Sequence, residues 1–148
     1  MIALVQRVKK ARVRVDDENV SSIGQGLLIL LGIHRDDGPG EVDWVARKCA
    51  NLRIFSDDDG KMNLSVVDVN GETLVVSQFT LYGSVEKGNR PSFVDSAPPE
   101  IAEPLYVEFV RRIADLTGRP TRTGRFGAMM DVELTNDGPV TIAIRRES

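Results

Sequence analysis

A short apolar run, Leu27–Leu31, limits the fold more than any other feature of this chain. Five apolar residues in succession, entered from Gly24-Gln25-Gly26, are typical of a β-strand that is buried on both faces. The run is far too short to cross a bilayer, which needs about 20 apolar residues. We therefore expect this segment to be the central strand, with the rest of the chain covering both of its faces.

Hydrophobic periodicity predicts the remaining elements. Alternation of apolar and polar residues indicates further strands, and a 3.6-residue period indicates two helices. The expected strands cover residues 2–15, 20–23, 53–55, 65–69, 73–81, 130–135 and 140–144, and the expected helices cover residues 41–51 and a segment that begins at a Ser96 cap and ends at Gly118. The last two strands are expected to form a hairpin through Asn136-Asp137-Gly138-Pro139, and residues 83–97 an ordered loop. This pattern indicates one α+β domain over residues 1–148 with mixed or antiparallel sheets.

Composition excludes several classes of function. The apolar share of 41% and the charged share of 28% are those of a globular protein. Because there is one cysteine and no signal-peptide pattern, we expect a cytoplasmic protein without an internal disulfide or a membrane partner. The formal net charge of −3 disfavours non-specific attraction to a polyanion, so any nucleic-acid binding must come from local basic patches, and we expect no DNA partner. Lys87–Arg90 and Arg111–Arg125 are two such patches, although each also fits an ordinary solvated surface.

Residues for conventional catalysis are scarce. A serine or cysteine nucleophile normally needs a base and an orienting partner, and the only histidine is His34, beside a glycine-rich loop. We assign His34 a structural or surface role, and Cys49, on the apolar stripe of a predicted helix, a core role. One histidine and one cysteine do not make a zinc site, and no P-loop or dinucleotide glycine pattern occurs. We therefore expect neither a metal nor a cofactor.

The polar residues within Val75–Tyr82 are the best remaining candidates for a site. If the strand continues through this stretch, Gln78 and Thr80 share one face while Ser77 and Phe79 share the other. Such a strand is either a solvated edge or one wall of a pocket. Hydroxyl, amide and backbone N–H groups suit polar recognition and the stabilisation of an oxyanion, without a strong acid or base from the protein.

Four segments resemble those of one enzyme family. Ser77–Leu81 and Asn136–Thr141 look like the paired signature of the D-aminoacyl-tRNA deacylases, and Lys87–Phe93 and Gly124–Met130 resemble the segments between them. The likeness runs from Met1 to about Arg146 without an identifiable insertion. Two separated motifs in the expected order, in a chain of the expected size, make this a specific signal.

The resemblance implies a barrel-like or roll core with the two main helices outside, and a homodimer with active sites at the subunit interface. It implies hydrolysis of the ester between a D-amino acid and the terminal adenosine of tRNA, and of glycine mischarged on tRNA(Ala). Gly138-Pro139 would be a cis peptide that reaches into the partner subunit's pocket and rejects L-amino acids by exclusion. Backbone N–H groups near Phe79 and Thr80 would hold the scissile carbonyl. Ser77 and Gln78 would hold the adenosine or the ester, and the ribose 2′-hydroxyl would help to activate water.

Further matching positions imply supporting roles. Arg7 would support the cross-subunit turn, and Ala102 and Met129 would line the adenosine or aminoacyl pocket; a strand-edge charge, helix packing and a core position are the respective alternatives. The residues expected to contact tRNA phosphates are Lys87, Arg90, Arg122 and Arg125. A covalent role for Thr80 stays open. So do two other functions, a non-catalytic module that binds RNA 3′ ends and a small-molecule esterase.

Overall fold

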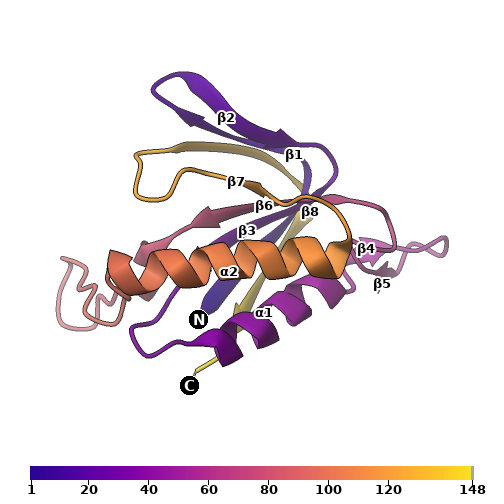
Figure 1. Cartoon of the computed structure of the whole chain (residues 1–148). Helices are drawn as coiled ribbons and strands as arrows, with labels where there is room; N and C mark the ends of the chain where they lie inside the picture. The colour runs from indigo at the N-terminus through magenta and orange to yellow at the C-terminus, as the bar shows by residue number, and fades with distance from the viewer. Residues whose placement is uncertain (148) are drawn as a thin grey trace.

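β3 (Gly26–Gly32) lies inside the sheet, as the apolar run predicts. The structure is a computed structural model that describes residues 1–147. β3 pairs antiparallel with β1 (Ile2–Val15) and parallel with β6 (Glu72–Ser77). The strands that complete this sheet are β2 (Glu18–Ile23) and β8 (Asp131–Arg145), which pair with β1, and β7 (Arg122–Thr123), which pairs with β6 (Figure 1).

Two helices lie together against the sheet (Figure 1). They are α1 (Pro39–Asn51) and α2 (Pro99–Thr117), and both were predicted from their apolar period. Leu27 and Ile29 of β3 belong to the core that includes buried residues of both helices. Leu28, which points the other way, belongs to a second cluster. Alternate residues of β3 are therefore buried in two separate cores, one on each face of the strand. Because both faces are buried, the run contains no polar residue.

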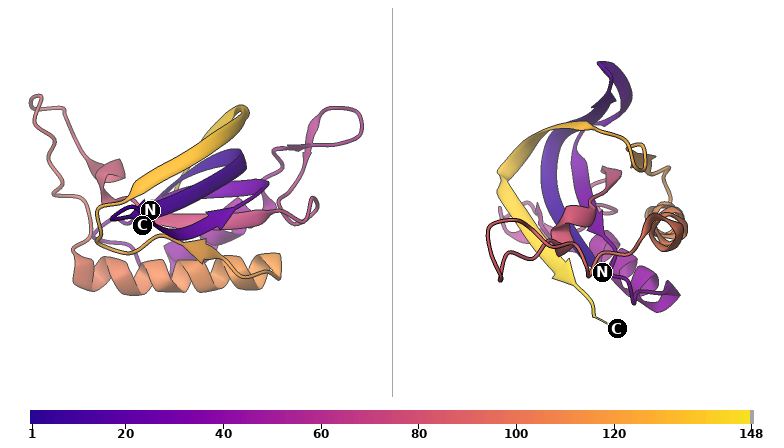
Figure 2. Two further views of the ribbon diagram at one scale, coloured as in Figure 1. Left: turned by 90° about the horizontal axis from the view of Figure 1, so that it is seen from above. Right: turned by 90° about the vertical axis from the view of Figure 1, so that its left-hand side faces the viewer.

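The second core fills the inside of a curved sheet (Figure 2). Its buried members come from four strands, β1, β2, β3 and β6: Val8, Ala11, Val13, Ile23, Leu28, Leu74 and Val76. The curve brings β2 toward β7, where the Ser21 hydroxyl donates to the carbonyl of Thr123 at 2.6 Å. The fold is thus α+β, with a nearly closed, barrel-like mixed sheet and two helices outside it, which confirms the fold expected from the sequence.

The hairpin predicted at the end of the chain is wrong. Residues 131–145 form one strand, β8, which stays antiparallel to β1 along its whole length. Asn136 pairs with Val8 and Thr141 with Gln6, so the residues between them form a bulge opposite a single β1 residue. The turn residues therefore push the backbone outward without reversing it, because β1 is long enough to pair with both halves of the strand.

The strand predicted over residues 73–81 ends early. β6 stops at Ser77, and residues 79–82 form a 3₁₀ turn, η1 (Phe79–Tyr82). The reason is a lack of strand partners: β7 pairs only with Leu74 and Val75, and the last backbone hydrogen bond to β3 is from Gln78 N–H to the Leu31 carbonyl at 2.8 Å. Beyond that point the backbone has to satisfy its hydrogen bonds locally.

The segment between α1 and β6 also differs from the prediction. A small hairpin of β4 (Phe55–Ser56) and β5 (Met62–Leu64) replaces the single strand expected at residues 53–55. Residues 65–69, predicted as a strand, form turns. There the Ser65 N–H donates to the Asp68 carboxylate at 2.9 Å, and the Asp68 N–H donates to the Ser65 hydroxyl at 3.2 Å. These local side-chain bonds compete with strand formation.

The cysteine and the histidine have structural environments. Cys49 is fully buried, and burial raises the pKa of its thiol to about 12. His34 Nδ1 accepts the Asp36 N–H at 3.1 Å, and its ring packs edge-on against Tyr82 with centroids 5.2 Å apart. Within residues 1–147, neither helix combines the length and apolarity required to cross a membrane.

Candidate active site

A cavity of about 560 Å³ opens where the parallel strands β3 and β6 both end. Its lining residues come from the ends of these strands, the start of α2 and the segment between β7 and β8: Ile33, Val76, Ser77, Gln78, Phe79, Ala97, Pro99, Ala102, Phe126, Gly127, Ala128, Met129, Met130 and Val132. Three residues of the Ser77–Leu81 motif line it, together with both residues predicted to line the pocket, Ala102 and Met129. The cavity is mainly apolar and presents a few polar groups, which is typical of a small-molecule site.

The early end of β6 gives the site its backbone donors. Within η1, Leu81 N–H donates to the Gln78 carbonyl at 3.2 Å and Gly83 N–H donates to the Thr80 carbonyl at 2.9 Å. The N–H groups of Phe79 and Thr80, in the first turn, have no hydrogen-bond acceptor among residues 1–147. Two adjacent backbone donors are therefore free next to the side chains of Ser77 and Gln78, as an oxyanion-binding role requires.

Thr80 itself is exposed and does not line the cavity. Its hydroxyl oxygen accepts a hydrogen bond from the Gln78 side-chain amide, and no other side-chain partner of this hydroxyl occurs in residues 1–147. Among residues 1–147, no histidine, lysine or carboxylate hydrogen-bonds to this hydroxyl, and none lines the cavity. The environment of Thr80 thus favours its backbone N–H over its hydroxyl as the functional group.

The strand that leads into the site is held rigidly. The Tyr106 hydroxyl of α2 donates to the Val75 carbonyl at 2.8 Å, and the Gly124 N–H reaches the same oxygen at 3.3 Å. Burial raises the pKa of Tyr106 to about 12, so this phenol stays protonated and able to donate at neutral pH. The end of β6 is therefore fixed both to α2 and to the segment that lines the opposite wall.

The two lining residues Met129 and Ala102 differ strongly in solvent exposure. Ala102 on α2 is 8% exposed and forms part of the cavity floor, whereas Met129 is 93% exposed at the rim. A core role for Met129, one of the alternatives open at the sequence level, is therefore wrong. A large, fully exposed apolar side chain at a cavity rim is available to contact a ligand or a partner.

The Gly138-Pro139 peptide is cis and exposed, at the bulge of β8. Arg7 holds the bulge from one side: its Nε donates to the Asp137 carbonyl at 2.9 Å, while Nη1 donates to the Ile54 carbonyl at 2.6 Å. Asn136 holds the other side, because its side-chain oxygen accepts the Val140 N–H at 2.6 Å. Two side chains, Arg7 and Asn136, thus hydrogen-bond to the turn from opposite sides.

This turn does not line the cavity of its own chain. Arg7, which faces the bulge, pairs with Leu27 near the start of β3, whereas Gln78 bonds to Leu31 near the end of it. Four residues along a strand span about 13 Å. Within one chain, the structure therefore brings together the first motif, Ala102 and Met129, and separately brings together Arg7 and the second motif.

The four cations expected to contact phosphate remain available. Lys87 and Arg90 lie on the loop of residues 83–97, which extends away from the rest of the molecule (Figure 2). Arg122 and Arg125 precede the lining residues Phe126–Met130. None of the four forms an ion pair within residues 1–147. In contrast, the arginines of α2 in the second basic patch are neutralised, Arg111 by Glu108 and Asp115 and Arg112 by Asp43.

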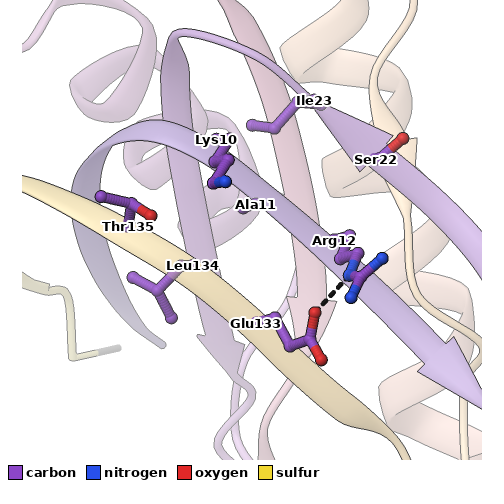
Figure 3. A pocket seen from close by; sticks show the side chains of 8 residues that line it. All are labelled: Lys10, Ala11, Arg12, Ser22, Ile23, Glu133, Leu134 and Thr135. Atoms are coloured by element: carbon purple, nitrogen blue, oxygen red, sulfur yellow. Dashed lines mark hydrogen bonds and ion pairs between the residues drawn. The ribbon is translucent and has the colours of Figure 1, made fainter.

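A second hollow, of about 560 Å³, lies over β1, β2 and β8 (Figure 3). Lys10 and Thr135 lie on its lining, and Arg12 and Glu133 form an ion pair across the strands there. This pair lowers the pKa of Glu133, so the carboxylate is ionised and not a general acid at neutral pH. None of the predicted site residues lines this hollow, and we do not assign the chemistry to it.

Sequence reasoning missed part of the lining. Phe126, Gly127 and Ala128 belong to a segment recognised only as a family-like stretch, and Ile33 and Ala97 look like ordinary core residues in the sequence. Ser96, predicted as a helix cap, donates instead from its hydroxyl to the Phe79 carbonyl at 2.8 Å, and α2 has no side-chain cap. Gly124 was the available signal of a close-packed wall, because a Cβ there would lie 2.7 Å from the Met130 sulfur.

Sequence comparisons identify the family of this chain. Residues 4–145 match the family described as D-Tyr-tRNA(Tyr) deacylase. A D-aminoacyl-tRNA deacylase of Desulfatibacillum aliphaticivorans is 60% identical over 144 residues, which cover 97% of this chain and 98% of that protein. One of Salinibacter ruber (strain DSM 13855 / M31) is 55% identical over 148 residues, which cover 100% of this chain and 99% of that protein.

Structural comparisons give the same fold. A solved structure described as c-Myc DNA Unwinding Element Binding Protein has a TM-score of 0.94 and 43% sequence identity, with 100% of both chains covered. Another, described as a probable eukaryotic D-amino acid tRNA deacylase, has a TM-score of 0.79 and 18% identity, with 97% of both chains covered, and supports the fold alone. From the match along nearly its full length and from its relatives, this chain belongs to the D-Tyr-tRNA(Tyr) deacylase family of hydrolases.

Proposed function

We propose that this protein hydrolyses the ester bond of D-aminoacyl-tRNA and releases the free D-amino acid and tRNA. The observation that carries the proposal is the pair of free N–H groups at Phe79 and Thr80 beside an apolar cavity, in a member of this family. The test is to compare the hydrolysis of D-tyrosyl-tRNA and L-tyrosyl-tRNA by the same preparation of protein.

The chemistry follows from what the cavity offers. The apolar lining, with Phe79 and Met129 at hand, suits a terminal adenosine, and Ser77 and Gln78 supply polar contacts to it or to the ester. The N–H groups of Phe79 and Thr80 stabilise the oxyanion that develops on the scissile carbonyl. Because no histidine, lysine or carboxylate of residues 1–147 lines the cavity, the ribose 2′-hydroxyl of the substrate helps to activate the attacking water, and no covalent intermediate is needed.

A second copy of the chain completes the site. The exposed Gly138-Pro139 turn is held outward by Arg7 and Asn136, and it lies too far along the sheet to reach the cavity of its own chain. In a homodimer, each turn enters the partner's cavity. Its carbonyl oxygens accept hydrogen bonds from the amino group of the substrate and leave no space for an L side chain.

The same exclusion mechanism extends the substrate range to glycine. Glycine has no side chain for the turn to reject, so glycyl-tRNA, including glycine mischarged on tRNA(Ala), is accepted without a separate pocket. The site then selects D-amino acids because an L side chain would clash with the turn and a D side chain, on the other side of the α-carbon, would not. This part of the proposal depends on the cross-subunit position of the turn.

Two rival functions fit the same cavity, and the description of one similar structure suggests DNA binding as a third. A module that only binds RNA 3′ ends would bind without ester loss, and a small-molecule esterase would cleave D-aminoacyl esters equally well without tRNA. The solved structure at 43% identity is described as a DNA-element-binding protein. We still expect no DNA partner here, because the net charge of −3 gives no overall attraction to duplex DNA.

Charge reversal should separate tRNA binding from chemistry. We expect Lys87→Glu with Arg90→Glu, and separately Arg122→Glu with Arg125→Glu, to raise KM for D-aminoacyl-tRNA roughly tenfold and to leave kcat nearly unchanged. Each lost phosphate contact should reduce the slope of log(kcat/KM) against log[salt] by about one. Steady-state kinetics at several salt concentrations measure both quantities.

The matched control makes the same change in charge on segments that carry none of the four expected phosphate contacts. Lys48→Glu with Lys61→Glu also replaces two cations by two carboxylates, on α1 and on the turn between β4 and β5 (Figure 1). This control should leave KM and the salt slope close to those of the unmodified protein. Equal effects in the control and the test variants would mean that net charge, and not these four residues, governs binding.

A further inference from the structure

Among residues 1–147, Ser96 makes the only side-chain hydrogen bond between η1 and the loop of residues 83–97. Its hydroxyl donates to the carbonyl oxygen of Phe79 at 2.8 Å, although the sequence places it where a helix cap is expected. That carbonyl belongs to the same peptide unit as the N–H of Thr80. Because a trans peptide is planar with its C=O and N–H antiparallel, a bond that fixes one end also fixes the direction of the other.

Ser96 is itself held on both sides. The carbonyl of Asp95 accepts the Arg35 N–H at 3.0 Å, and the Ala97 N–H donates to the Ile33 carbonyl at 2.9 Å. Both partners follow directly from the end of β3, the central strand. The backbone on both sides of Ser96 is therefore fixed next to the end of β3. In contrast, η1, which the Ser96 hydroxyl contacts, does not pair with any described strand.

A second contact keeps the same two segments in register. The rings of Phe79 and Phe93 pack edge to face with centroids 5.1 Å apart. Packing of two exposed rings restricts the position of η1 but does not set the rotation of a peptide plane. The Ser96 hydrogen bond restricts that rotation beyond what the 3₁₀ turn does, and it also polarises the peptide, which makes the Thr80 N–H a stronger donor.

We propose that Ser96 is a positioning residue for ester hydrolysis, which acts through the Phe79–Thr80 peptide by aiming the Thr80 N–H at the scissile carbonyl. The inference rests on the proposed function, because it assumes that this N–H stabilises the oxyanion. It assigns no contact between Ser96 and the substrate. Its consequence is that the end of the long loop, and not η1 alone, determines the geometry of the reaction.

The test is a kinetic comparison of Ser96→Ala, Ser96→Thr and Ser92→Ala. Ser96→Ala should lower kcat for D-aminoacyl-tRNA roughly tenfold, the size of one lost hydrogen bond, with KM within about twofold. Ser96→Thr keeps the hydroxyl and should restore most of the rate. Ser92→Ala removes a hydroxyl in the same loop that has no side-chain hydrogen bond in residues 1–147, and should have no effect. The same loss is expected with a D-aminoacyl ester of adenosine, because the tRNA body is not involved.

A spectroscopic measurement tests the contact between Ser96 and the Phe79–Thr80 peptide independently of enzyme activity. The amide ¹⁵N chemical shift of Thr80 should move in Ser96→Ala and return in Ser96→Thr, whether or not the protein is active. An unmodified protein that leaves D-aminoacyl-tRNA intact would overturn the proposed function, and the catalytic role of Ser96 with it. An active protein whose Ser96→Ala variant keeps a normal kcat, or loses affinity alone, would overturn only the role of Ser96.

Discussion

Replacement of Thr80 by proline is expected to lower kcat by about 10²–10³-fold, the loss measured when one oxyanion donor is removed from other enzymes. Proline deletes the N–H of residue 80, and that N–H has no acceptor within residues 1–147, so the fold loses no backbone hydrogen bond. The residue lies in the first turn of η1, where a missing N–H removes no helical hydrogen bond. Single-turnover hydrolysis of D-aminoacyl-tRNA measures the effect.

Thr80→Val is the matched control for that experiment. Valine keeps the N–H and the β-branched shape but removes the hydroxyl that accepts from Gln78. We expect its kcat to stay within about threefold of normal, because only one exposed hydrogen bond is lost. If valine abolished turnover as fully as proline, the hydroxyl and not the amide would be the functional group, and the covalent alternative would be correct. An α-hydroxy acid at position 80 removes the N–H without the ring and checks the proline result.

The second large effect is expected from Gly138→Ala, which should lower the ratio of D- to L-ester hydrolysis at least tenfold. Gly138 has φ +142°, which L-residues rarely adopt. A Cβ there would lie 2.7 Å from the Val140 side chain, 3.0 Å from its backbone nitrogen and 3.2 Å from Arg7 Nη2. The bulge must shift to accept it, so the turn no longer fits the cavity it is proposed to enter.

Gly60→Ala provides the comparison for this variant. Gly60 also has a positive φ, of 75°, but no atom lies within 4 Å of the position of its Cβ, and it belongs to the turn between β4 and β5. It should share the backbone cost, of about 1–2 kcal/mol, without changing the preference for D esters. Loss of stereochemical preference in both variants would point to general destabilisation. An unchanged preference in Gly138→Ala would contradict the gating role of the turn.

The sequence predicts those helices and strands whose formation depends on a pattern repeated over many residues. The run at Leu27–Leu31, the alternation in β1 and the apolar period of α2 all reflect burial, and burial is averaged over a whole element. The site motifs are predicted by resemblance to a family and not by any local rule. Ser77, Gln78 and Phe79 do meet Ala102 and Met129 in one cavity, but nothing in their spacing requires it.

The errors occur where partners far along the chain decide the local structure. β6 ends at Ser77 because no strand flanks it further on, which its own residues do not reveal. Asn136–Pro139 has the composition of a hairpin turn, yet the length of β1 converts it into a bulge. These two departures produce the free amides and the outward turn on which the proposed function depends. The contact of Ser96 with Phe79 joins residues 17 positions apart, and no local pattern predicts it.

The most direct test of the account uses one preparation of the unmodified protein with D-tyrosyl-tRNA and L-tyrosyl-tRNA in parallel. We expect the D ester to be cleaved with multiple turnovers and the L ester to decay at its spontaneous rate. D-tyrosyl-adenosine, which lacks the tRNA body, should be cleaved with a lower kcat/KM. Loss of the D ester no faster than in a protein-free sample would contradict the proposed activity, and equal loss of D and L esters would contradict the chirality mechanism.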